Sequence, residues 1–222
     1  MRAVILLSGG LDSATVLAIA KSRGRDCLAM SIVYGQRHEI ELAAARRVAA
    51  AIGVTEHVVY PLDLRVFGAS ALTSDAAVPK DAVGAPGIPI TYVPARNTIV
   101  LSLALAYAEA RVAEEIWLGI NALDYSGYPD CRPEFVDAFQ QVILRGTRSG
   151  VEHSQPRIVA PLIEMTKGEI IRQGTSLSVD YSLTHSCYDP DRHGRACGHC
   201  DSCLLRKKGF EEAGVADPTV YV

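Results

Sequence analysis

The feature that most constrains the fold is a short apolar run that ends in a glycine-containing turn and continues into a helix. Residues Ala3 to Leu7 are wholly apolar, which is typical of a strand buried on both faces of a parallel sheet. The run ends at Ser8-Gly9-Gly10-Leu11-Asp12-Ser13, and Ala14 to Lys21 then carries alanine and leucine at helical spacing. This order predicts the first unit of an α/β sheet.

The rest of the chain repeats this alternation, so we expect a doubly wound, mostly parallel, Rossmann-like sheet with helices on both faces. Further strands are expected at Cys27–Val33, Glu56–Tyr60, Pro89–Val93, Glu115–Ile120 and Ile158–Leu162. Further helices are expected at Glu39–Ala51, Thr98–Arg111, Pro133–Arg145, Lys167–Gln173 (ending at Gly174) and Cys203–Ala213.

One long segment, Pro61 to Pro89, breaks the alternation because it is rich in glycine and proline and shows little periodicity. We expect a short helix near Leu64 to Leu72. The segment is either a surface insertion, a lid over a site or a subunit contact.

Composition excludes several classes of protein. The 222 residues are 49% apolar, so the chain is not disordered, and 22 Lys and Arg against 25 Asp and Glu leave no basic surface over the whole chain. No apolar run approaches the roughly 20 residues of a membrane helix, and the N-terminus is a poor signal peptide. We therefore expect a soluble cytoplasmic protein with no membrane or nucleic-acid partner.

The glycine-containing turn has the chemistry of a phosphate site. Gly9 and Gly10 let the backbone approach a ligand closely, while the free N–H groups and the dipole of the following helix favour an anion. Ser8 and Ser13 add hydroxyl donors, and Asp12 could cap the helix or hold magnesium beside the phosphates. The turn lacks Gly-Lys-Ser/Thr and Gly-x-Gly-x-x-Gly, and a plain structural turn is the alternative.

Two other loops are expected at the same carboxyl edge of the sheet, where ligands of open α/β folds bind. In the first, Arg37 could pair with a phosphate or carboxylate, while Gln36 and His38 are polar groups near the carboxyl edge of the sheet. In the second, Arg96 is the best candidate to hold phosphate or a substrate carboxylate, and an exposed arginine in a capping loop is the alternative.

The loop between Asn121 and Pro133 gathers polar and aromatic groups between a strand and a helix. One carboxylate can accept both the ring N–H and the exocyclic amine of a guanine-like base, and a tyrosine can stack on its ring. An ordinary polar loop is the alternative, and we interpret Cys131 and Cys27 as bystanders. The candidate substrate residues are Asp124, Tyr125, Tyr128, Asp130 and Arg132.

Four of the six cysteines crowd near the C-terminus, and in a reducing compartment such a cluster indicates a metal. Four thiolates suit tetrahedral zinc, and a site with no open position is structural. An iron–sulfur cluster is the competing interpretation, and His199 could replace one cysteine. The ligands are Cys187, Cys197, Cys200 and Cys203.

Together these strings resemble the 7-cyano-7-deazaguanine synthase family of the ATP-pyrophosphatase (PP-loop) superfamily. The turn alone resembles the superfamily's pyrophosphatase loop. The more specific match is its combination with Gly35–His38, Asp124–Arg132, and Asp180-Tyr181-Ser182-Leu183-Thr184 leading into the cysteines.

The resemblance implies a ligase that converts 7-carboxy-7-deazaguanine, ammonia and ATP to the 7-cyano base through an adenylated carboxylate and an adenylated amide. It also implies ATP with Mg²⁺, one structural Zn²⁺ per chain and a homodimer. Residues 1–180 would form the ATP-binding synthetase domain and 181–222 a helical zinc-binding segment. Catalytic roles are expected for Ser8, Asp12, Ser13 and Arg96. ATP contacts are expected from Leu7, Ser8, Gly9, Gly10, Leu11, Asp12, Ser13, Ala14, Thr15, Val16, Leu17, Gln36 and Arg37.

Two alternatives stay open at this point. A homologue of the same superfamily could adenylate another carboxylate or a tRNA base, although the mild acidity disfavours tRNA. A zinc-knuckle RNA-binding protein is the alternative from another class. The chain has no room for a glutaminase, which favours free ammonia as the nitrogen source.

Overall fold

The computed structural model describes residues 1–35, 40–122, 127–152 and 156–222. Within them the strands form one five-stranded, all-parallel sheet in the order β3-β2-β1-β4-β5. The strands are β1 (Arg2–Leu6), β2 (Asp26–Val33), β3 (Glu56–Pro61), β4 (Glu115–Trp117) and β5 (Arg157–Val159). The expected doubly wound parallel sheet is therefore confirmed, with the first strand at its centre.

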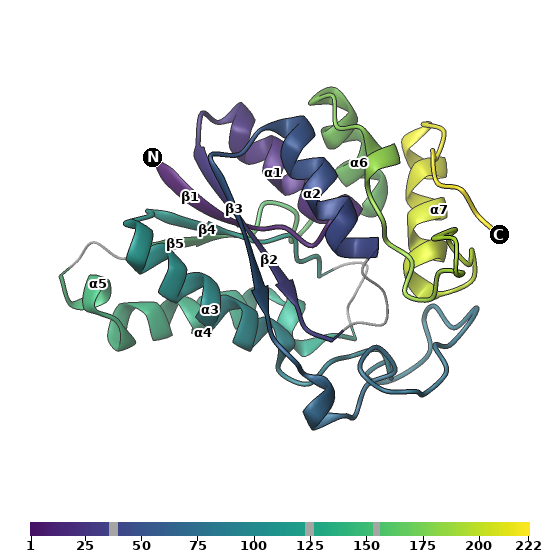
Figure 1. Ribbon diagram of the computed structural model, residues 1–222, viewed down its shortest axis with the longest axis horizontal. Helices are drawn as coiled ribbons and strands as arrows, with labels where there is room; N and C mark the ends of the chain where they lie inside the picture. The colour runs from purple at the N-terminus through teal and green to yellow at the C-terminus, as the bar shows by residue number, and fades with distance from the viewer. Residues whose placement is uncertain (36–39, 123–126, 153–155) are drawn as a thin grey trace.

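Helices cover both faces of this sheet (Figure 1). One layer holds α1 (Leu11–Ser22), α2 (Ile40–Ile52), α6 (Lys167–Ser176) and α7 (Asp201–Ala213), and the other holds α3 (Arg96–Arg111), α4 (Pro133–Gly146) and α5 (Arg148–Val151). Short 3-10 turns occupy Arg65–Phe67, Pro129–Cys131 and Tyr181–Leu183.

The apolar first strand explains why two layers form. Alternate side chains of a strand point to opposite faces, so Ala3 and Ile5 enter the core beneath α1 while Val4 enters the core beneath α3. Each of these three residues is fully buried. Phe210 of α7 lies in the same core as Ile5, so the C-terminal helix is packed into the main body.

Two expectations about secondary structure are wrong. Residues 89–93 form turns rather than a strand, and the Thr91 hydroxyl bonds to the Tyr128 hydroxyl at 2.7 Å instead of entering the sheet. Gly174 lies inside α6, which continues to Ser176, and the glycine instead makes room for the Tyr181 hydroxyl, which occupies the space of a Cβ. The expected helix near 64–72 is reduced to the 3-10 turn Arg65–Phe67.

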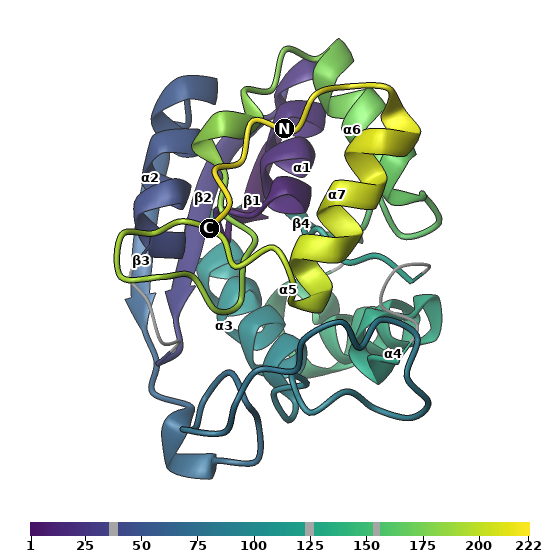
Figure 2. The same ribbon diagram turned by 90° about the vertical axis from the view of Figure 1, so that its right-hand side faces the viewer.

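The irregular segment 62–95 packs on the cysteine-containing segment. Leu64, Leu72 and Val78 share a small core with Cys187 and Cys200. Figure 2 shows the two segments on the same side of the molecule. Among the described residues, no helix combines the length and apolarity needed to span a bilayer.

Candidate active site

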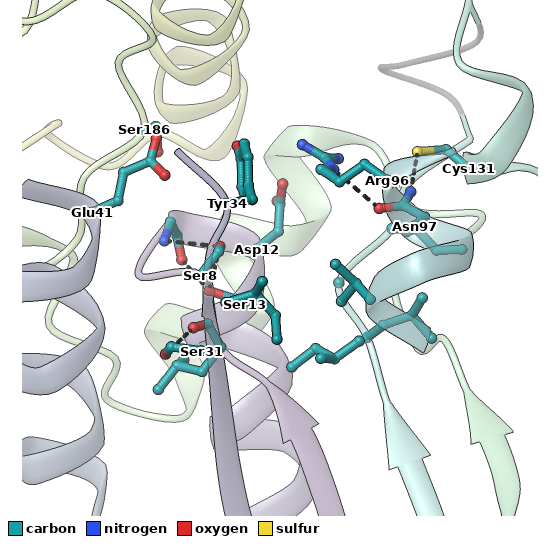
Figure 3. A pocket seen from close by; sticks show the side chains of 18 of the residues that line it. Ser8, Asp12, Ser13, Ser31, Tyr34, Glu41, Arg96, Asn97, Cys131 and Ser186 are labelled. Carbon is teal, nitrogen blue, oxygen red and sulfur yellow. Dashed lines mark hydrogen bonds between the residues drawn. The ribbon is translucent and has the colours of Figure 1, made fainter. Parts of the chain in front are cut away.

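A cavity of about 250 Å³ opens at the carboxyl edge of the sheet (Figure 3). It lies beside β1 and β4, where the strand order reverses, which is the position at which open α/β sheets bind ligands. Its walls come from the ends of β1, β2 and β4, the first turns of α1 and α3, and the residues around Ser186.

The nucleotide loop, residues 7–13, is fixed by backbone geometry that only glycine permits. Gly9 has a φ of +88°, and a Cβ there would lie 2.3 Å from the Glu41 carbonyl oxygen and 2.6 Å from the Ala45 nitrogen. The first turns of α2 therefore pack directly on the loop.

Serine hydroxyls complete the loop. The Ser8 hydroxyl donates to Ser13 Oγ at 3.1 Å, and Ser13 Oγ accepts the Gly9 N–H at 3.2 Å while donating to the Gly10 carbonyl at 3.0 Å. Gly10 is the N-cap of α1 and contributes no side-chain cap, so the N–H groups of the first turn face the cavity edge. This is the arrangement that binds a phosphate.

Asp12 is paired with a buried lysine. Lys167 Nζ lies 2.8 Å and 2.9 Å from the two carboxylate oxygens of Asp12, and the lysine side chain is only 6% exposed. The lysine stem runs along α7 because position 209 is glycine, where a Cβ would lie 2.3 Å from the stem. Capping of α1 by Asp12 is wrong, since the N-cap is Gly10. The carboxylate instead lines the cavity beside a cation.

The structure separates the predicted nucleotide residues into two groups. Those that line the cavity are Leu7, Ser8, Gly10, Asp12 and Ser13. The side chains from Ala14 to Leu17 point into the protein, where Ala14, Val16 and Leu17 are core residues and the Thr15 hydroxyl contacts Tyr181. Gln36 and Arg37, like His38, fall outside the described residues.

Arg96 lies across the cavity from the nucleotide loop, at the start of α3. Its guanidinium lies 5.9 Å from the centre of the Tyr34 ring, and its Nε donates to Asn97 Oδ1 at 3.3 Å. Burial acts to lower the pKa of Arg96, but the nearby Tyr34, Tyr188, Cys131 and Asp130 raise it above its usual value. The cavity therefore has the permanent positive charge of Arg96 on the wall opposite the nucleotide loop.

The substrate loop is only partly described, because Asp124 and Tyr125 lie outside the described residues. Tyr128 lines the cavity, but Asp130 does not. The Asp130 side chain is buried, and its carboxylate accepts the backbone N–H of Asn97 at 3.3 Å, at the first turn of α3. Arg132 is exposed and serves as the N-cap residue of α4.

Cys131 lies at the cavity wall as a protonated thiol. Burial, and then the charge of Asp130, raise the pKa of Cys131 to about 11. Its sulfur accepts a weak hydrogen bond from the Asn97 amide at 3.5 Å. Since the thiolate is the nucleophilic form, Cys131 has no basis for covalent chemistry near neutral pH.

The four predicted cysteine ligands meet at one point, with all four sulfur atoms within 4.8 Å of one another. Cys187 Sγ accepts the backbone N–H groups of Asp189 and Cys197, at 3.3 Å and 3.2 Å, and Cys197 Sγ accepts that of Cys200 at 3.3 Å. Hydrogen bonds from the neighbouring thiols, Cys187 first and then Cys203, lower the pKa of Cys200. N–H groups aimed at sulfur stabilise thiolates, so this set could hold a metal ion. His199 is 64% exposed and faces Asp81 instead.

The comparison with known families agrees with this geometry. The family model described as queuosine biosynthesis protein QueC matches residues 2–214. This chain belongs to the QueC family. Proteins named 7-cyano-7-deazaguanine synthase from Kineococcus radiotolerans and Paramagnetospirillum magneticum are 63% and 60% identical to it, over 99% of this chain and 97% and 98% of theirs.

A solved structure supports the fold alone. A 4-thiouridine synthetase, in an RNA complex with bound ATP, is 18% identical with a TM-score of 0.54 and covers 96% of this chain. This chain covers 50% of that protein.

Several residues at the QueC site escaped the sequence analysis. Gly119 lets β4 approach α1, because a Cβ there would lie 3.2 Å from the Ser13 nitrogen. Lys167 was expected only as the start of a helix. The capping box of Thr166 and Glu169 indicates that start, but nothing in it indicates that Lys167 pairs with Asp12. Asn121, which opens the predicted substrate loop, also lines the cavity, and other cavity residues that no local motif marked are His185, Ser186, Tyr188 and Ser202.

Replacing Gly9 with alanine tests the packing of α2 on the nucleotide loop. We expect Gly9→Ala to lower the free energy of unfolding by about 1–2 kcal/mol for the left-handed φ and about 1–3 kcal/mol more for the displaced backbone. Gly53→Ala is the matched control, because Gly53 has a φ of +82° but nothing within 4 Å of the added Cβ. Urea denaturation measures both, and equal losses would contradict the packing argument.

Proposed function

We propose that this enzyme is a 7-cyano-7-deazaguanine synthase, which joins ammonia to 7-carboxy-7-deazaguanine at the expense of ATP. The observation that carries the proposal is one cavity that is lined both by the nucleotide loop and by Tyr128 of the substrate loop. That arrangement lets a substrate carboxylate meet the α-phosphate of ATP. Membership of the QueC family over nearly the whole chain supports the choice of substrate.

The reaction has two activations. The carboxylate attacks the α-phosphate, pyrophosphate leaves, and ammonia displaces AMP to give an amide. The amide oxygen attacks a second ATP, pyrophosphate leaves again, and loss of AMP with two protons gives the nitrile. In each activation negative charge builds up on the departing pyrophosphate, starting at the β-phosphate. The site must therefore supply fixed positive or N–H groups at that position.

The described residues provide these groups. The N–H groups at the start of α1 and the hydroxyls of Ser8 and Ser13 would hold phosphate oxygens. Arg96 would hold the substrate carboxylate or the α-phosphate from the opposite wall. Asp12 is the carboxylate that would hold Mg²⁺, with Lys167 beside it to balance the charge when the metal is absent.

An assay with the purified protein tests the function directly. Incubation with ATP, Mg²⁺, ammonium and the 7-carboxy base should yield the 7-cyano base, AMP and pyrophosphate, detected by mass spectrometry. Asp12→Asn should lower kcat about a hundredfold or more, because the carboxylate that would hold Mg²⁺ beside the phosphates is lost. Glu164→Gln, at an exposed position in the loop after β5, should retain full turnover. Wild-type protein that forms no nitrile would reject the proposal.

The two aspartates of the substrate loop differ in what they can do. Asp130 already accepts the Asn97 N–H, so we assign reading of the base to Asp124. Asp124→Asn should therefore erase the preference for the base over an analogue without the exocyclic amine, a preference of about ten-thousandfold in favourable sites. Asp130→Asn should lower stability but keep the preference. The opposite pattern in kcat/KM would overturn this assignment.

The metal of the cysteine cluster is proposed to be structural zinc. A tetrahedral site with Zn–S bonds of about 2.3 Å separates its sulfurs by about 3.8 Å, whereas an iron–sulfur cube needs wider spacing. The 4.8 Å limit on all sulfur separations therefore favours a single ion. Such a site supplies about 10–16 kcal/mol in small modules, which is as large as the net stability of a domain.

Elemental analysis tests the zinc assignment. We expect about one zinc per chain in the wild type and almost none in Cys200→Ser, which should also be poorly soluble because α7 and segment 62–95 pack on the cluster. Cys27→Ser, a buried cysteine of β2 outside the cluster, should retain its zinc. Iron with labile sulfide in the wild type would contradict the assignment.

A homodimer completes the proposal. Segment 62–95 carries apolar side chains that this chain leaves exposed, and we assign the dimer contact to them because a second copy would remove them from water. They are Val66, Phe67, Val83, Ile88 and Ile90. Light scattering gives the mass in solution.

A further inference from the structure

One buried arginine outside the cavity connects the cysteine cluster with the nucleotide loop. Arg206 lies on α7, three residues after the cysteine ligand Cys203, so the two side chains share a helix face. Its side chain is only 3% exposed. Arg206 neither lines the cavity nor belongs to the cysteine cluster.

The guanidinium of Arg206 holds the segment 181–188, which we call the strap. Nη2 donates to the Tyr181 carbonyl at 3.2 Å, and Nη1 donates to Thr184 Oγ1 at 2.9 Å and to Ser186 Oγ at 3.3 Å. Nε donates to Asp217 Oδ1 at 3.0 Å. The planar fork of arginine thus fixes three points of one strap, which a lysine cannot do.

The strap in turn holds α1 and the nucleotide loop at two points. The Tyr181 hydroxyl lies 2.8 Å from Thr15 Oγ1 within α1, and the backbone N–H of His185 donates to the Gly9 carbonyl at 2.9 Å. Between these contacts and the cysteines, His185 and Ser186 line the cavity. The strap is therefore both a brace behind the loop and part of the cavity wall.

We propose that Arg206 is a positioning residue, which sets the nucleotide loop in its ATP-binding geometry by way of the strap. The inference rests on the proposed function, since it assumes that the loop binds ATP. The loop contacts α2 at Gly9 through backbone atoms alone. Among the described contacts, the Gly9 carbonyl accepts only the N–H of His185, so this bond from the strap holds the carbonyl in place. Loosening the strap would let the carbonyl of Gly9 turn and the adjacent N–H groups lose their alignment.

The test compares Arg206→Lys with Asp217→Asn in the metal-loaded, full-length protein. Arg206→Lys keeps a charge for Asp217 but loses at least two strap contacts, so we expect ATP–Mg²⁺ to bind about tenfold or more weakly by calorimetry. The KM for ATP should rise while that for the 7-carboxy base stays unchanged. Asp217→Asn keeps all three strap contacts, and it should lower the melting temperature without changing ATP affinity.

Two further measurements keep the result decisive. Metal content must stay at the wild-type level in Arg206→Lys, so that weaker ATP binding is not caused by metal loss. If Arg206→Lys does not fold, Thr184→Val replaces it: this change removes one bond from Arg206 to the strap and one bond within the strap, to the Tyr181 carbonyl, and should weaken ATP binding about threefold or more. Unchanged ATP affinity in these strap variants, or equal weakening in Asp217→Asn, would overturn the proposal. Wild type that binds ATP but forms no nitrile would contradict the proposed function alone, and the comparison of affinities would still decide the role of Arg206.

Discussion

The close backbone contact at Gly9 is the constraint on which the rest of the site depends. A carbonyl and an amide of α2 stand where a side chain would begin, and the Gly9 carbonyl itself accepts the N–H of His185. Three segments that are far apart in the sequence therefore meet at one residue. None of these contacts involves a side chain of residue 9, so the geometry is set by main-chain contacts with α2 and with the strap together.

The position of the cavity follows from the order of the strands. With β1 at the centre and β4 beside it, the loop after β1 and the loop after β4 open at the same edge but run to opposite layers of helices. The cavity of about 250 Å³ lies between them. Gly119, two residues after β4, leaves room for the start of α1, because a Cβ there would lie 3.2 Å from the Ser13 nitrogen.

Local sequence patterns predicted the parts of the structure that depend on interactions between residues close together in the sequence. The apolar first strand and the turn after it predicted β1, α1 and the loop between them, because each residue there is constrained by its neighbours in sequence. The cysteine spacing predicted the cluster for the same reason. The parallel sheet followed from the alternation of elements alone.

Contacts between distant residues could not be predicted in this way. Residues 89–93 look like a strand, but the segment begins with Pro89 and the Thr91 hydroxyl bonds to Tyr128, and the segment stays out of the sheet. The carboxylate of Asp130 had the composition of a substrate ligand, yet its partner is the backbone of Asn97, 33 residues away. Lys167 meets Asp12 across 155 residues, so no motif contained both.

Two largely buried ion pairs position the C-terminal third of the chain: Lys167–Asp12 joins α6 to the nucleotide loop, and Arg206–Asp217 joins α7 to the segment that follows it. Burying a pair such as Lys167–Asp12 or Arg206–Asp217 costs desolvation energy that the attraction between the charges only roughly offsets. The apolar cores therefore supply the stability of α6 and α7, and the ion pairs add little to it.

What a buried pair does provide is a single allowed position, since any other packing leaves a charge unpaired at a cost of about 3–5 kcal/mol. If α6 were held only by leucine and isoleucine, it could slide by a fraction of a turn, which would move the Lys167 ammonium away from the Asp12 carboxylate. The Lys167–Asp12 pair makes such slippage costly and so keeps α6 in register with the nucleotide loop, while the other three hydrogen bonds of the paired Arg206 hold the strap.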